Sequence, residues 1–181
     1  VVLHDLGSMF RGLLGEPIAF DTDLSATRPR VSMDHGQLEQ LLLNLVINAR
    51  DALPQGGEVT IRTRDVRLTG QEGHLIRAGR EGDYVELVVR DNGIGMDHET
   101  MRQIFEPFYT TKPHGKGTGL GLASVYGVVQ QACGALAVTS EPGQGAAFHI
   151  NLPVTPEPAR PRNTGSPVSA GRGGRERVLL V

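Results

Sequence analysis

Two asparagines four residues apart, Asn44 and Asn48, lie in one of the most apolar stretches of the sequence. The spacing of the apolar residues predicts a helix over 35–53, and one stripe of that helix is polar. The stripe consists of Gln37, Gln40, Asn44, Asn48 and Asp51. Apolar residues flank it on both sides, whereas an ordinary solvated face would be charged. The stripe is therefore either a set of buried amides bonded to backbone or a row of oxygens lining a cleft, where Mg²⁺ could bind.

A second candidate site begins with Asp91, directly after a predicted strand over 84–90, and reads Asp91-Asn-Gly93-Ile-Gly95-Met96. One interpretation is a turn in which glycine supplies a positive φ. The functional interpretation is that the Asp91 carboxylate accepts a hydrogen bond from an exocyclic amine, while the glycines let the backbone approach a flat ring.

Glycine occupies every second position from Gly115 to Gly121, ahead of a helix predicted over 118–132. The spacing matches neither a P-loop nor the dinucleotide fingerprint. Backbone N–H groups exposed by glycine at the start of a helix nevertheless favour phosphate. The only two lysines of the chain, Lys112 and Lys116, lie beside or within this run. A flexible linker is the alternative, but a linker would not repeat glycine at a strict period of two and then begin a helix.

The remaining sequence predicts the elements that position these residues. The expected helices cover 3–14, 35–53, 98–104 and 118–132, and the expected strands cover 18–24, 59–64, 84–90, 136–140 and 148–152. A polar excursion over 65–83 joins two of the strands. Helices mixed with closely spaced hairpins predict a two-layer α/β sandwich rather than a doubly wound parallel sheet.

Composition excludes several classes of protein. The chain has 181 residues, of which 39% are hydrophobic, and its net charge of −2 gives no reason to expect nucleic-acid binding. The single Cys133 rules out an internal disulfide, so an intracellular location is expected. We expect a folded domain over 1–154, a flexible Pro/Arg/Gly linker over 155–175, and the first strand of a truncated receiver domain over 176–181.

The motifs occur in a recognisable order. Asn44-x3-Asn48, Asp91-x-Gly-x-Gly, Phe105-Glu-Pro-Phe-Tyr109 and Gly-x-Gly-x-Gly-x-Gly resemble the N box, first glycine box, F box and second glycine box of sensor histidine kinase ATP-binding catalytic domains. The resemblance covers about 1–153, and its Phe-Glu-Pro-Phe-x-Thr-Thr-Lys wording is similar to the nitrogen-regulation type. It implies the Bergerat fold, an α/β (α+β) two-layer sandwich with a mixed, mostly antiparallel sheet and a mobile ATP lid.

The resemblance also implies a role for each matching residue. Asn48 would ligate Mg²⁺, Asn44 would orient the metal and phosphates, and Asp91 would accept from the adenine amine. Gly93, Gly95 and Met96 would form the floor beside the adenine. The residues expected near the phosphates are Lys112, Lys116, Gly117, Thr118, Gly119, Leu120, Gly121 and Leu122. Asp51 and Thr111 complete the expected ATP-binding set, and Lys112 joins Asn44 and Asn48 as a catalytic candidate.

Three positions depart from the family pattern. Asp51 stands where some members have a lysine that touches phosphate, so the lid lysines must supply that charge. Tyr109 replaces the commoner phenylalanine of the F box. The final hairpin reads Gly145-Ala-Ala-Phe148 and lacks hydroxyls that could hold water near adenine, so nucleotide binding is expected to be weaker.

The implied function is to bind Mg²⁺-ATP and to transfer its γ-phosphate to a histidine on a dimerisation domain outside this chain. The implied partners are that domain of the same kinase and a response regulator or receiver domain, in a homodimeric parent protein. The domain is expected to be cytoplasmic, whether or not its parent is membrane-anchored. His4 precedes an acid, but no second hairpin helix fits before the strand at 18–24, so we expect a catalytic domain cut from a longer, hybrid kinase.

Two rival functions remain open. An ATP-hydrolysing clamp of the gyrase, chaperone or mismatch-repair type would usually carry glutamate where Asn44 stands, and it lacks this F box. A nucleotide-binding module without catalysis is the other alternative, against which the intact Asn48, Asp91 and glycine boxes argue.

Overall fold

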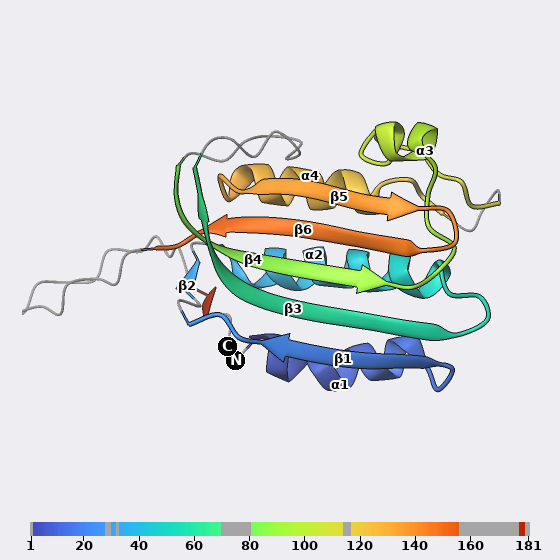
Figure 1. Ribbon diagram of the computed structural model, residues 1–181, viewed down its shortest axis with the longest axis horizontal. Coiled ribbons are helices and arrows are strands. Elements are labelled where there is room, and N and C mark those ends of the chain that lie inside the picture. Colours follow the sequence, from blue (N-terminus) through green and yellow to red (C-terminus); the bar gives the residue numbers. More distant parts are fainter. Residues whose placement is uncertain are drawn as a thin grey trace, which may run out of the picture.

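A five-stranded sheet with helices on one face forms the domain (Figure 1). The computed structural model describes residues 2–27, 30–31, 33–69, 81–113, 117–155 and 178–179. Its helices are α1 (Val2–Leu14), α2 (His35–Asp51), α3 (His98–Gln103) and α4 (Gly121–Gln131). Its strands are β1 (Ile18–Leu24), β2 (Arg30–Val31), β3 (Gly57–Leu68), β4 (Gly82–Asp91), β5 (Ala135–Glu141), β6 (Gly145–Pro153) and β7 (Val178–Leu179).

The sheet is mixed and mostly antiparallel, which confirms the predicted two-layer sandwich. Its strand order is β1-β3-β4-β6-β5, with β1 parallel to β3 and the other neighbours antiparallel. Helices α1, α2 and α4 all lie behind the sheet in Figure 1, so no described helix covers the opposite face of the sheet.

The core lies between the sheet and the helices. Alternate residues of β4 point to the helices, and Val85, Leu87 and Val89 are buried there while Arg90 is exposed. The helix side contributes Phe10, Leu38, Leu41, Leu42 and Leu45, all at 1% exposure or less. Burial on this scale holds α2 against the sheet and fixes the direction of its polar stripe.

Helices α2 and α4 differ from the prediction at their ends. The Asp34 carboxylate accepts from the Gln37 backbone N–H, as predicted for the start of α2, but α2 ends at Asp51 instead of residue 53. Helix α4 begins at Gly121 instead of residue 118. Gly119 has φ +65° and its carbonyl accepts from the Phe108 N–H at 2.9 Å, a conformation that cannot continue a helix.

The strands β3 and β4 are longer than predicted, because residues expected in the polar excursion join the ladder out to Leu68 opposite Gly82. Leu68, Tyr84 and Ala135 form a second small apolar cluster that stabilises this end. Residues 65–68 and 82–83 look like a polar loop in the sequence, and they form strands because of their packing across the sheet.

The last described segment, Val178–Leu179, pairs antiparallel with Arg30–Val31. The linker expected over 155–175 lies outside the described residues except for Thr155, and the assignment of 176–181 to a receiver domain stays a prediction. No helix in the described ranges is long and apolar enough to cross a membrane.

Candidate nucleotide-binding site

The polar stripe of α2 faces α4. A Cβ atom on Gly121, at the start of α4, would lie 3.8 Å from Asn44 Oδ1 and 3.9 Å from Asn48 Nδ2. Along the stripe, Gln40 Nε2 donates to Asn44 Oδ1 at 3.2 Å, and Gln37 Nε2 donates to Gln131 Oε1 of α4 at 2.9 Å. These bonds run between side-chain amides and not to backbone, which favours the cleft interpretation of the stripe over the buried-amide one.

Lys112, from the segment before α4, reaches this stripe. Its Nζ lies 2.5 Å from Asp51 Oδ2 and 3.4 Å from Asn48 Oδ1. Burial raises the pKa of Asp51, but hydrogen bonds from Lys112 and Arg50 outweigh it and hold the pKa of that carboxyl below its ordinary value. Asp51 is therefore a carboxylate at neutral pH.

The donor set suits Mg²⁺. The amide oxygen of Asn48 and the carboxylate of Asp51 already surround one cation, the ammonium of Lys112. Oxygen donors of this kind are the ones Mg²⁺ takes, and it usually reaches protein through one or two of them while keeping waters and phosphates. Within the described residues no group of three His, Cys, Asp or Glu side chains could hold a metal, so a magnesium ion here would need phosphate oxygens to complete its coordination.

The start of α4, which faces the same place, has no side-chain cap. Leu120 is its N-cap residue and provides no side-chain cap, so the first N–H groups of α4 have no side-chain partner from that residue. Thr118 Oγ1 accepts from the Leu120 N–H at 3.4 Å, and Leu120 is 44% exposed. Leu122 packs against the core, so the helix is anchored while its first turn faces the amide stripe.

Asp91 ends β4 and is 4% exposed. Its Oδ1 accepts from the Gly93 N–H at 2.9 Å and from the Ala146 N–H at 3.3 Å. Burial raises the pKa of Asp91, and these backbone bonds and the nearby Arg90 charge oppose the rise. Two fixed N–H donors orient the carboxyl, which is what a recognition group for an amine requires.

The glycines after Asp91 have a packing role. A Cβ on Gly93 would lie 2.2 Å from the Ala52 carbonyl oxygen, and one on Gly95 (φ +66°) would lie 2.0 Å from that of Glu141. The Ile94 N–H also donates to the Ala52 carbonyl at 3.0 Å. The contacts of Gly93 and Ile94 join the first glycine box to the C-cap of α2, four residues past Asn48, and the approach of Gly95 joins it to the end of β5. A role of Gly93 and Gly95 beside adenine stays a prediction.

Two residues of this region were not found by sequence reasoning. Ser140 Oγ accepts from the Met96 N–H at 2.9 Å and donates to the Gly145 carbonyl at 2.7 Å, so it fixes the glycine box to the final hairpin. Ala146 contributes only its backbone N–H to Asp91. No signal in the sequence marks a backbone donor, whereas the β5–β6 hairpin prediction places Ser140 near Gly145.

The described part of the lid packs on the second glycine box. A Cβ on Gly117 would lie 2.7 Å from Thr110 Oγ1, and one on Gly119 would lie 2.3 Å from the Phe108 carbonyl carbon. Phe108 itself has φ +70° and is 75% exposed. Thr111 is exposed beside Lys112. The expected phosphate contact Lys116 lies outside the described residues.

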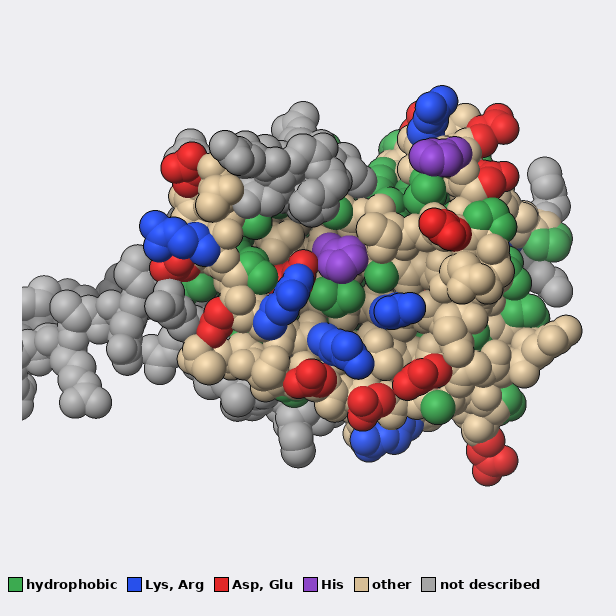
Figure 2. Space-filling view, viewed as in Figure 1, with side chains coloured by type: hydrophobic (Ala, Val, Ile, Leu, Met, Phe, Trp, Pro, Cys, Tyr) green, Lys and Arg blue, Asp and Glu red, His purple; other side chains and the backbone are tan. Residues whose placement is uncertain are grey.

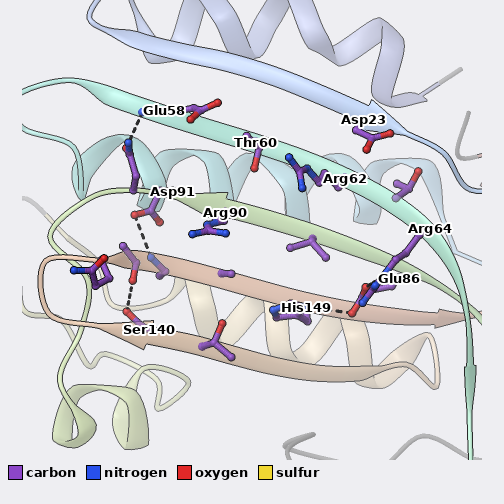
Figure 3. Close-up of a pocket in the computed structure, with 18 of the residues that line it drawn as sticks. Asp23, Glu58, Thr60, Arg62, Arg64, Glu86, Arg90, Asp91, Ser140 and His149 are labelled. Atoms are coloured by element: carbon purple, nitrogen blue, oxygen red, sulfur yellow. Dashed lines mark hydrogen bonds and ion pairs between the residues drawn. The ribbon is translucent and has the colours of Figure 1, made fainter.

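A separate hollow of about 690 Å³ lies on the open face of the sheet and touches only the first glycine box, through Asp91 and Asn92. Figure 2 shows basic side chains and a histidine in the middle of this face, and Figure 3 identifies Arg62, Arg90 and His149 there. Asp91 lies at one end of the hollow, but Asn44, Asn48 and Lys112 do not line it. It is therefore not the place where the four motifs meet.

The family of histidine kinase-, DNA gyrase B- and HSP90-like ATPases matches residues 33–156. Among curated proteins, the sensor kinase CckA of Brucella abortus is 43% identical over 152 residues, which are 84% of this chain and 16% of that protein. The sensor histidine kinase ZraS of Salmonella typhi is 33% identical over 154 residues, 85% of this chain and 30% of that protein. The chain thus spans about a sixth to a third of these relatives.

Solved structures of the same kind share the fold. The mycobacterial sensor histidine kinase MprB superposes with a TM-score of 0.66 at 29% identity, covering 86% of this chain and 95% of that one. Full-length ShkA in complex with AMPPNP gives a TM-score of 0.61 at 28% identity, over 87% of this chain and 29% of that one. The motifs, the sheet order and these likenesses agree. The chain belongs to the histidine kinase-, DNA gyrase B- and HSP90-like ATPase family and is an ATP-binding catalytic domain of the sensor histidine kinase type.

Proposed function

We propose that this domain binds Mg²⁺-ATP between α2, α4 and the lid, and transfers the γ-phosphate to a histidine of a dimerisation domain in two-component signalling. The observation that carries the proposal is the convergence of motifs on the C-terminal half of α2. Lys112 meets Asn48 and Asp51 there, Gly121 of α4 lies beside Asn44, and the loop after Asp91 bonds to Ala52.

Each group has a chemical task in this arrangement. Asp91, held through Oδ1, would accept from the adenine amine through its other oxygen. Asn48 and, through outer contacts, Asn44 would hold Mg²⁺, which when bound neutralises charge on phosphate oxygens. Lys112 and the first N–H groups of α4 would orient the γ-phosphate.

The transfer itself needs positioning more than a base. The lone pair of a neutral imidazole nitrogen forms the N–P bond, the bond from phosphorus to the bridging oxygen breaks with its electrons on ADP, and the proton leaves the other ring nitrogen. Asn44 is an amide and cannot activate water as a carboxylate would. This favours transfer over the hydrolysis of an ATP-driven clamp.

The partners are proposed on the same grounds. They are the histidine-containing dimerisation domain of the parent kinase, assembled as a homodimer, and a response regulator or receiver domain. We place the domain in the cytoplasm, where ATP is available, and the nitrogen-regulation subtype stays a prediction.

Calorimetric titration of the chain with AMPPNP, with and without Mg²⁺, tests the proposal. We expect saturable binding that tightens when Mg²⁺ is added. Binding that is insensitive to Mg²⁺, or no binding at all, would contradict it.

A further inference from the structure

The carboxylate of Asp51 is held in place on both oxygens. Oδ1 accepts from Arg50 Nε at 3.1 Å and from Arg50 Nη2 at 3.0 Å, and Oδ2 accepts from Lys112 Nζ at 2.5 Å. Asp51 and Lys112 expose only 29% and 31% of their side chains. Because Arg50 occupies one oxygen, the other is the one turned toward the lid.

The lysine arrives from a segment 61 residues further along the chain. Its backbone N–H donates to Thr110 Oγ1 at 3.2 Å, and a Cβ on Gly117 would lie 3.1 Å from its Cδ, so the stem is packed as well as the head. The ammonium then lies 3.4 Å from Asn48 Oδ1, the expected Mg²⁺ ligand.

We propose that Asp51 is a positioning residue of the nucleotide site: its carboxylate holds the Lys112 ammonium beside Asn48, so that the charge stands at the phosphate end before ATP arrives. This inference rests on the proposed function, since it assumes that phosphates occupy that end. An unattached lysine loses much rotamer freedom when it binds a phosphate, and a lysine that is already held loses less. An ammonium has three N–H donors, so bonds to Asp51 and Asn48 leave one for a phosphate oxygen.

The arrangement explains the departure of Asp51 from the family pattern. Where some members place a lysine directly on the helix at this position, this chain places a carboxylate there and brings the lysine from the lid. A lysine on the helix and a lid lysine held by Asp51 both place one ammonium about one helical turn beyond Asn48. The two should therefore be interchangeable, and the double variant Asp51→Lys with Lys112→Gln should bind nucleotide better than Lys112→Gln alone.

The experiment measures AMPPNP affinity by calorimetry and lid amide exchange in the nucleotide-free protein for a set of variants. Asp51→Asn should bind roughly three- to ten-fold more weakly and should exchange the amides of 109–112 faster without nucleotide. Asp51→Glu should retain most of the affinity. Asp51→Asn combined with Lys112→Gln should bind no more weakly than Lys112→Gln alone, because a positioning residue acts only through the group it positions.

Glu39→Gln is the matched control, since it removes a carboxylate from the same helix about three turns away and should change neither measurement. Tighter binding by Asp51→Asn would overturn the proposal, because Asp51 would then compete with phosphate for Lys112. Additive losses in the double variant, or unchanged lid exchange in Asp51→Asn, would also overturn it. If the wild-type chain binds no nucleotide, the proposed function fails, and the lid exchange still reports whether Asp51 holds Lys112.

Discussion

At the scale of single residues, Asp91 is the group that we expect to recognise the adenine base. Its Oδ1 already accepts from two backbone N–H groups, so Asp91→Asn can keep those bonds with its amide oxygen and change only the other atom. The other atom becomes the NH₂ of the asparagine amide. This group would face the adenine amine, and two donors cannot form a hydrogen bond with each other. We expect ATP affinity to fall about ten-fold or more, since a charge-assisted bond is worth roughly 1.5–3 kcal/mol.

Asp97→Asn is the matched control for that change. Asp97 caps α3 by accepting from the Thr100 N–H at 2.8 Å, and asparagine caps helices equally well. Calorimetry should show normal affinity for this variant. Unchanged affinity in Asp91→Asn would remove Asp91 from the adenine site.

We expect Asn48 to act at the phosphate end of the site. Its amide oxygen lies 3.4 Å from the Lys112 ammonium, so it already faces one cation. The same oxygen is the expected ligand of Mg²⁺. We expect Asn48→Ala to abolish the tightening of nucleotide binding by Mg²⁺ and to leave Mg²⁺-free binding largely intact, because the oxygen can act only through the metal. Titration over a Mg²⁺ series measures this. A normal Mg²⁺ dependence would point to Asn44 as the ligand instead.

At the scale of elements, one charged cluster joins three strands on the open face of the sheet (Figure 3). Glu86 on β4 accepts from Arg64 Nε on β3 and lies 3.2 Å from His149 Nδ1 on β6. The hydrogen bond with His149, followed by that with Arg64, lowers the pKa of Glu86 to about 2 against the effect of burial. The carboxylate thus stabilises the fold above its ordinary pKa of 4.5, and that contribution is lost as the pH falls toward 2.

We therefore expect Glu86→Gln to lower the free energy of unfolding at pH 7 by about 1–2 kcal/mol, and by less at pH 3. Urea denaturation at both pH values measures the difference. Asp83→Asn removes an exposed partner of Arg67 across the same two strands and should cost less than about 0.5 kcal/mol. An equal effect of Glu86→Gln at pH 7 and pH 3 would contradict the linkage.

The lid is the element that nucleotide should order. Phe105 anchors its start against Tyr126 with ring centroids 5.8 Å apart, but after Tyr109 the described lid contains no apolar side chain except Pro113. We expect amides in the lid over 105–117, above all those after Tyr109, to exchange faster than those of α2 in the nucleotide-free protein. Hydrogen exchange as slow there as in α2 would contradict this.

At the scale of the whole molecule, the chain should bind Mg²⁺-ATP without phosphorylating itself. Of its histidines, His35 and His98 are the first residues of α2 and α3, and His149 contacts Glu86 on the sheet, so none of these three lies in a helical hairpin of the kind expected to carry the acceptor. Mixed with a separate dimerisation domain that carries an acceptor histidine, the chain should label it slowly, since the effective concentration of a tether is missing.

To test which protein is labelled, the chain and the added domain are incubated with γ-labelled ATP, separated on a gel and treated with acid or base. The label should be on the added domain, lost in acid and stable in base, as a phosphohistidine is. Stoichiometric label on the chain alone that disappears in His4→Gln would show instead that His4 is the acceptor.

The sequence alone determined the family, the polar residues of the candidate site and most of the elements that carry them. The amide stripe of α2, its Asp34 cap and the carboxylate ending β4 are local features, since periodicity, capping and turn chemistry act within a few residues. The order of these motifs identified the family, and the two-layer sandwich followed from the same elements.

Only the tertiary structure decided which of these groups meet. The bond from Lys112 to Asp51 spans 61 residues and that from Ala146 to Asp91 spans 55, and neither has a local signal. Such contacts depend on the register of β4 with β6 and on how α2 and α4 pack, because a shift of one residue in a strand turns its side chains to the other face. Non-local bonds also outweigh the local preference at two element ends. The pairing with β4 extends β3 to Leu68, and the bond from the Phe108 N–H to the Gly119 carbonyl makes α4 begin at Gly121 and not at 118.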